Sequence, residues 1–114
     1  MDYVELETLE SFKTFISKDT LTVITFDVGP TFLQHLFRKN LDSWAPELAG
    51  KVTFGNVNAI SRLYYELRTT TEYTHEGQAT FIFFKNGKML EKLVPETSSM
   101  FYWAIQNHIK QTKN

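Results

Sequence analysis

The fold of this chain is decided by the stretch Gln78-Ala79-Thr80-Phe81-Ile82-Phe83-Phe84-Lys85-Asn86-Gly87-Lys88. Residues 81–84 are apolar at every position, which is typical of a central strand covered by helices on both faces. The run breaks at Asn86-Gly87, a pair that tolerates the positive φ angles of a type I′ turn. Residues 88–94 then form the return strand. The stretch predicts a β-hairpin whose first strand is buried. A hairpin of a β-sandwich is the alternative, and the elements on either side decide between the two.

Hydrophobic spacing on either side of the hairpin predicts strands that alternate with helices. Strands are expected over 3–6, 21–26 and 52–57, and helices over 8–17, from 31 to a stop or kink at Pro46, over 60–68 and over 98–110. The apolar stripes of these helices are Leu9, Phe12, Phe15 and Ile16, then Leu33, Leu36, Phe37, Leu41 and Trp44, then Ile60, Leu63, Tyr64 and Leu67, and last Phe101, Ala104, Ile105 and Ile109.

The predicted element order is βαβαβαββα, which places the chain in the α/β class. Strands that alternate with helices favour parallel pairing with right-handed crossovers, and the hairpin adds an antiparallel edge. We therefore expect a mixed central sheet of about four or five strands with helices on both faces. Residues 1–114 are expected to form a single domain, with 110–114 as a frayed tail.

Composition excludes several classes of function. The chain has 114 residues, of which 42% are hydrophobic and 15% aromatic, enough for one core but not for two domains. A net charge of −1 predicts no nucleic-acid partner and no membrane partner. Neither a long apolar run nor a basic, apolar leader is visible, and cysteine is absent. We expect a cytoplasmic or nuclear protein without disulfides or thiol chemistry.

The element order and the hairpin motif resemble the thioredoxin family over nearly the whole chain. Residues 80–88 are similar to the family's Pro-Thr-(apolar)₄-Lys-Asn-Gly segment, and Gly77 stands where the family has glycine. Residues 21–26 resemble the strand that leads to the active site, and the spacing from Thr31 through Gln34 to Val52 matches without gaps. The resemblance implies the thioredoxin fold.

The dithiol motif that the family uses for chemistry is missing. In the gapless alignment Cys-X-X-Cys falls on Thr31-Phe32-Leu33-Gln34, whereas an alignment on Gly29-Pro30 puts Val28 and Thr31 in the cysteine positions. Thiol–disulfide exchange needs an attacking thiolate, and a threonine hydroxyl stays protonated. We therefore predict that the chain is not a disulfide oxidoreductase and not an enzyme of this type.

Other positions at which the resemblance implies a role are also changed. The family's cis-proline corresponds to Ala79, and a cis bond there would cost about 2.5–4 kcal/mol, so the Gln78–Ala79 bond is expected to be trans. The buried acid of the family falls near Thr25, which cannot titrate. Because glutathione binding in related folds uses the missing proline, a glutathione-dependent transferase-like enzyme is only an alternative.

No cofactor or metal is predicted. His35, His75 and His108 lack the spacing of metal ligands and are expected to be solvated or hydrogen-bonded. Residues 69–77 are hydroxyl-rich and are expected to form an ordinary solvated loop; coordination of a ligand or phosphorylation is the alternative.

Two aromatic residues point to a protein partner. Phe32 falls on the family's substrate-facing rim, where it widens an apolar patch unless it folds back onto the core. Trp103 lies opposite the buried stripe of the last helix, with Tyr102 and Met100 beside it. This combination is typical of an interface hot spot, although a single exposed aromatic is also common on plain surfaces.

These observations predict a non-catalytic interaction module or adaptor subunit with a protein partner, with a homodimer among the alternatives. A holdase-type chaperone is a further alternative. The expected contact residues are Pro30, Thr31, Phe32, Gln78 and Ala79 on the former active-site rim, and Trp103 and Tyr102 on the last helix.

Overall fold

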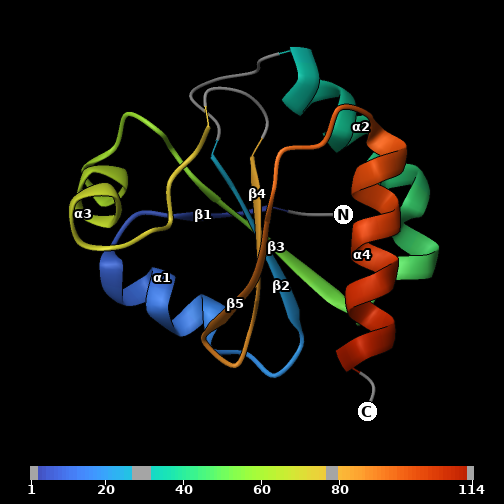
Figure 1. The fold of residues 1–114 in the computed structure, drawn as a ribbon, viewed down its shortest axis with the longest axis horizontal. Coiled ribbons are helices and arrows are strands. Elements are labelled where there is room, and N and C mark those ends of the chain that lie inside the picture. Colours follow the sequence, from blue (N-terminus) through green and yellow to red (C-terminus); the bar gives the residue numbers. More distant parts are fainter. Residues whose placement is uncertain (1–2, 27–31, 77–79, 113–114) are drawn as a thin grey trace.

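The structure is a computed structural model that describes residues 3–26, 32–76 and 80–112, without the side chains of residues 3, 32–38 and 112. Within these ranges the chain forms three layers, a central sheet with helices on each face (Figure 1). This arrangement confirms the α/β class and the helices on both faces that the sequence predicts.

The sheet of the described residues has five strands in the order β1-β3-β2-β4-β5. The strands are β1 (Tyr3–Leu6), β2 (Leu21–Phe26), β3 (Val52–Val57), β4 (Phe81–Lys85) and β5 (Lys88–Leu93). β1 and β2 both run parallel to β3, whereas β4 is antiparallel to β2 and β5 is antiparallel to β4. The mixed sheet is therefore as expected, with β2 at its centre.

The helices cover the sheet in pairs. α1 (Leu9–Ile16) and α3 (Arg62–Thr70) lie on one face, and α2 (Phe32–Leu48) and α4 (Ser98–Thr112) lie on the other (Figure 1). α1 begins with a capping box, in which the Thr8 side chain accepts the Ser11 N–H and the Ser11 side chain accepts the Thr8 N–H.

β4 contributes to the hydrophobic cores on both faces. Phe81 and Phe83 pack with residues of α2 and α4, whereas Ile82 and Phe84 pack with residues of α1 and α3. All four side chains have 0% exposure. The unbroken apolar run therefore forms the buried strand that its pattern predicts.

The Asn86-Gly87 turn has the positive φ angles that the sequence predicts, 55° and 80°. Its backbone also binds the end of α1, because Asn86 N–H donates to the Lys18 carbonyl at 2.8 Å and Gly87 N–H to the Ile16 carbonyl at 2.9 Å. The hairpin is thereby fixed against a helix that lies far from it in the sequence.

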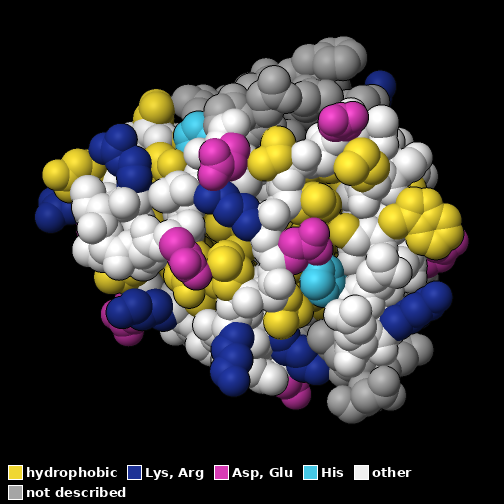
Figure 2. All heavy atoms as spheres, in the orientation of Figure 1, with side chains coloured by type: hydrophobic (Ala, Val, Ile, Leu, Met, Phe, Trp, Pro, Cys, Tyr) yellow, Lys and Arg dark blue, Asp and Glu magenta, His cyan; other side chains and the backbone are white. Residues whose placement is uncertain are grey.

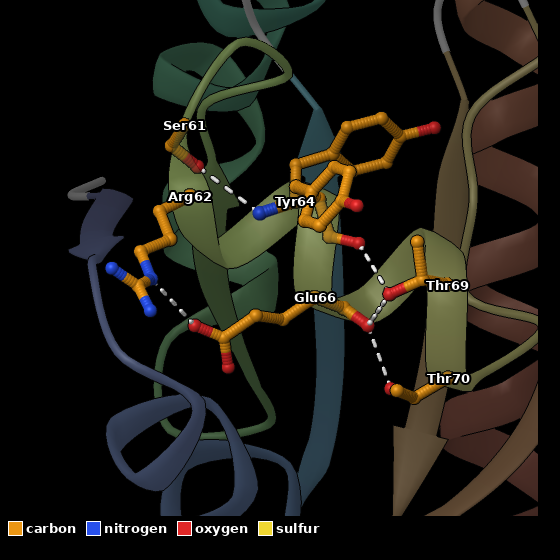
Figure 3. Close-up of polar contacts among 7 residues, drawn as sticks. Ser61, Arg62, Tyr64, Glu66, Thr69 and Thr70 are labelled. Carbon is orange, nitrogen blue, oxygen red and sulfur yellow. Dashed lines mark hydrogen bonds and ion pairs between the residues drawn. The ribbon is translucent and has the colours of Figure 1, made fainter.

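The predicted start of α3 is wrong. The helix begins at Arg62 rather than at Ile60, because Ser61 is its N-cap and accepts the Tyr64 N–H (Figure 3). Ile60 precedes the cap, its own N–H donates to the Asn58 side chain, and it is 77% exposed rather than part of the core.

Three helices extend beyond the C-terminal ends that the sequence predicts. α3 continues through Thr70, and the hydroxyls of Thr69 and Thr70 donate to carbonyls of the preceding turn (Figure 3). α2 passes Pro46 and ends at Leu48, because proline removes only one N–H and Ala49 N–H still reaches the Ala45 carbonyl. α4 continues to Thr112, so the frayed tail does not begin at residue 110.

Candidate functional site

The predicted contact residues near position 30 and position 78 follow β2, which ends at Phe26, and precede β4, which begins at Phe81. Thr25 pairs with Phe81, so the end of β2 and the start of β4 lie side by side in the sheet. Residues Pro30, Thr31, Gln78 and Ala79 of the predicted contact set, and the bond between the last two, lie outside the described residues. Phe32 is the first residue of α2, and its side chain also lies outside them.

A chain of hydrogen-bonded polar side chains crosses the sheet close to the end of β2. Thr25 has 0% exposure, and its hydroxyl donates to the Asn56 amide oxygen at 2.7 Å. The Asn56 amide nitrogen donates to the carboxylate of Glu5 at 3.0 and 3.3 Å. The three residues are in register on β2, β3 and β1.

At its buried end this polar chain consists of neutral hydrogen-bonding groups. Neither Thr25 nor Asn56 gains or loses a proton at physiological pH, and the only carboxylate, Glu5, is exposed. The arrangement satisfies buried polar atoms but offers no buried acid. Sequence reasoning identified Thr25 and missed Asn56, although an asparagine inside the apolar strand 52–57 was the available signal.

The segment after α3 is not the ordinary solvated loop that was expected. The His75 ring lies 5.1 Å from the Tyr64 ring and 6.2 Å from the Phe26 ring, measured between centroids. The backbone N–H of His75 donates to the Tyr64 hydroxyl at 3.1 Å. These contacts hold the segment against the end of β2.

Further contacts fasten the same segment to the sheet. Tyr73 packs edge-on against Phe84 at 5.0 Å. The Lys92 ammonium of β5 lies 2.8 Å from the Thr74 hydroxyl and 3.0 Å from the Glu76 carboxylate. The described part of this segment is therefore anchored between α3 and β5.

The other predicted contact surface lies on α4. Trp103 is 62% exposed and Met100 is 46% exposed, and both are residues of α4. They line a groove of about 430 Å³ between α4 and β5, together with Glu91, Leu93, Ala104, Asn107, His108 and Gln111. Figure 2 shows hydrophobic side chains gathered over β5 and α4, with acidic and histidine side chains between them. We call these groove residues the Trp103 surface.

His108 and Glu91 are two of the polar residues of this groove, and they join α4 to β5. The His108 Nε2 lies 2.7 Å from a Glu91 carboxylate oxygen, and the imidazole packs on the Phe83 ring at 4.8 Å. Nδ1 of His108 is buried and has no hydrogen-bond partner among the described residues. The geometry fits an Nε2–H group that donates to the Glu91 carboxylate.

Tyr102 contacts α2 as well as Trp103, whose ring meets the Tyr102 ring edge-on at 6.3 Å between centroids. Its hydroxyl donates to the Glu47 carboxylate, and its ring lies 4.9 Å from the Trp44 ring. The hydrogen bond to Glu47, followed by burial and the charge of Glu47, raises the pKa of Tyr102 above its usual value. Tyr102 therefore fixes α4 against α2, while its neighbour Trp103 is left exposed.

Metal and membrane sites have no support among the described residues. No group of three or more His, Asp or Glu side chains in residues 3–26, 32–76 and 80–112 could hold a metal ion. The helices in the same ranges are too short or too polar to cross a bilayer.

Comparison with known proteins identifies the fold but no sequence family. No protein-family model matches the chain, and no curated protein matches its sequence. The solved structures that it resembles include thioredoxin from Trypanosoma brucei brucei, with a TM-score of 0.73 and 23% identity over 96% of this chain and 92% of the other. Malassezia sympodialis thioredoxin has a TM-score of 0.72 and 25% identity, over 95% of this chain and 91% of the other. Chlamydomonas reinhardtii thioredoxin f2 has a TM-score of 0.75 and 19% identity, over 94% of this chain and 96% of the other.

The chain shares the fold of these proteins but contains no cysteine. The whole α/β architecture is common, but the chain has no thiolate of its own for disulfide exchange. The chain therefore has the thioredoxin fold and contains no cysteine.

Proposed function

We propose that the chain is a non-catalytic interaction module, an adaptor subunit that holds one protein partner on the Trp103 surface. The observation that carries the proposal is a 62% exposed tryptophan on a well-packed helix beside a groove. Exposure of so large an apolar side chain is unfavourable unless a partner covers it, and tryptophan is enriched among interface hot spots. The loss of thiol chemistry fits a protein that works by binding.

The shape of the surface favours a helical partner. The groove runs between α4 and β5, and apolar and polar residues line it in equal number, which suits the apolar face of an amphipathic helix flanked by polar residues. Glu91 lines the groove and Glu96 lies just before α4, so basic residues beside the partner's apolar face would complement it. A reducing compartment, the cytoplasm or nucleus, fits the lack of cysteine.

The former active-site rim is the second surface at which the same function is proposed. Residues Pro30, Thr31, Phe32, Gln78 and Ala79 would hold an extended peptide there, as the resemblance to thioredoxins implies. The described contacts support the Trp103 surface more directly, because its exposure and groove are both on described residues.

Affinity capture with matched variants tests the proposal. Wild type, Trp103→Ala and Phe32→Asp serve as baits in native lysate, followed by quantitative mass spectrometry. Tyr65→Ala is the matched control, because Tyr65 is 59% exposed but lies on α3, on the opposite face of the sheet. Trp103→Ala should change the free energy of unfolding by less than about 0.5 kcal/mol, so lost capture would not reflect unfolding.

The expected result is one partner at near-equal stoichiometry that Trp103→Ala loses and Tyr65→Ala keeps. Because the chain has no cysteine, Asn107→Cys then provides a unique crosslinking site inside the groove. A crosslink to a helix of that partner would locate the contact. Many weak clients insensitive to every variant would indicate a holdase chaperone instead, and glutathione binding in calorimetry would favour the enzyme alternative.

A further inference from the structure

β1 is an edge strand with one open side. It pairs with β3, and no other described segment pairs with it on its outer side. Backbone N–H and C=O groups on such an edge are available to an added strand. The pairing is regular from Tyr3↔Phe54 to Leu6↔Val57, so no bulge interrupts the edge.

The opposite edge of the sheet is protected in ways that β1 is not. The register of β5 against β4 shifts between Phe83 and Phe84, which leaves Leu90 as the extra residue of a bulge. β5 also carries Lys88 and Lys92. Bulges and lysines are the devices by which edge strands resist pairing, so β5 is a poor site for strand addition.

A shallow apolar hollow lies beside the open edge. It has a volume of about 400 Å³ and lies between β1 and α1. Val4 and Leu6 line it from the strand, and Phe15 lines it from the helix. Val4 is 47% exposed, whereas Leu6 and Phe15 are buried. An apolar side chain on an added strand would cover Val4 and fill this hollow.

The charge around the edge is mainly acidic. Glu5, Glu7 and Glu10 are all exposed, whereas the nearby Lys18 lies over the Phe15 ring at 4.5 Å. Glu5 accepts from Asn56, but a carboxylate has further acceptor sites for a cation. Basic groups on an added strand would meet this acidic rim.

We propose that the open edge of β1 binds an extended segment of a partner protein in which apolar residues alternate with lysine or arginine. Its apolar side chains would lie in the row of Val4 and Leu6 over the hollow, and its basic side chains in the row of Glu5. A second copy of this chain does not fit, because two acidic edges would be brought together. The site is separate from the Trp103 surface, so either proposal stands if the other fails.

Binding of a synthetic peptide to the full chain tests this proposal. The probe is fluorescein-labelled Lys-Val-Lys-Val-Lys-Val, measured by fluorescence anisotropy at about 20 and 300 mM salt. Two control peptides are Glu-Val-Glu-Val-Glu-Val, which reverses the charge, and Lys-Lys-Lys-Val-Val-Val, which keeps the composition without the alternation. Hydrogen exchange of the complex locates the bound peptide on the chain.

Variants separate the charge of this edge from the overall charge. Glu7→Lys combined with Glu10→Lys reverses the acidic rim, and Asp42→Lys combined with Glu72→Lys makes the same change of net charge at exposed positions elsewhere. Val4→Lys adds a positive charge on the edge itself and keeps the test valid if the first variant folds poorly. Circular dichroism confirms the fold of each.

The proposal predicts that only the alternating basic peptide binds, with slowed exchange at the amides of residues 3–6. Affinity should fall by about tenfold or more in Glu7→Lys/Glu10→Lys and in Val4→Lys but not in the control variant, and it should weaken in high salt. Protection elsewhere, equal binding of all three peptides, no binding, or dimerisation of the chain through β1 would each overturn it.

Discussion

Single polar residues inside the sheet show how buried hydrogen-bonding groups are satisfied in this chain. Thr25 and Asn56 are both nearly fully buried, and each supplies the hydrogen bond that the other needs at 2.7 Å. A buried polar atom without a partner costs about 1–3 kcal/mol, whereas removal of both partners can be nearly neutral. The pair is therefore expected to be strongly coupled.

A double-mutant cycle measures this coupling. Asn56→Leu leaves the Thr25 hydroxyl without its acceptor and should lower the free energy of unfolding by about 1–3 kcal/mol. Thr25→Val together with Asn56→Leu should cost less than the sum of the single changes, as measured by urea unfolding. Glu5→Gln is the control at the exposed end of the chain and should change stability by less than about 0.5 kcal/mol. Additive costs would contradict the coupling.

The contact between α1 and the sheet depends on a glycine in β3. A Cβ atom at Gly55 would lie 2.6 Å from the Phe15 ring and 3.0 Å from Leu6 Cδ1. Glycine inside a strand often marks the close approach of another element, and here the element is α1. The position of α1 on the sheet is thus set by the absence of a side chain.

Gly55→Ala tests how closely the helix and sheet are packed. The added methyl forces Phe15 to move and should lower the free energy of unfolding by about 1–3 kcal/mol in urea unfolding. Phe15→Leu removes the ring and provides the matched rescue. The double variant should lose less free energy of unfolding than the two single variants lose together. If the two losses simply add, the Phe15 ring is not what the added methyl group at position 55 displaces.

At the scale of the whole molecule, β4 joins the two hydrophobic cores into one folding unit. Its residues alternate between the core beneath α2 and α4 and the core beneath α1 and α3. A change on one face must therefore be felt on the other through the shared strand. Domains of this size usually unfold in a single transition.

Ile82→Ala tests this coupling between faces. Ile82 packs with α1 and α3, whereas Trp44 and Trp103 report on the α2 and α4 side. The cavity should cost about 2–5 kcal/mol, and tryptophan fluorescence and far-UV circular dichroism should shift to the same lower urea midpoint. Separate midpoints would mean that the two cores unfold independently.

The sequence alone determined the elements whose signals are local. The apolar run of β4, the positive φ of Asn86-Gly87 and the helical stripe of α4 all depend on residues close together in the chain, and each is present as expected. The lack of cysteine also settled the absence of thiol chemistry without any structure. Periodicity failed at Ile60, because its spacing fits the stripe of α3 but the helix begins only after the Ser61 cap.

Only the tertiary structure decided which distant residues meet. Glu5 and Asn56 are 51 positions apart and become neighbours through the pairing of β1 with β3. Anchoring of His75 by Tyr64 and the open edge of β1 likewise follow from packing and strand order. Local patterns record which face of an element is apolar, but the partner of each face depends on how the whole chain closes, and that is set by contacts between segments far apart in sequence.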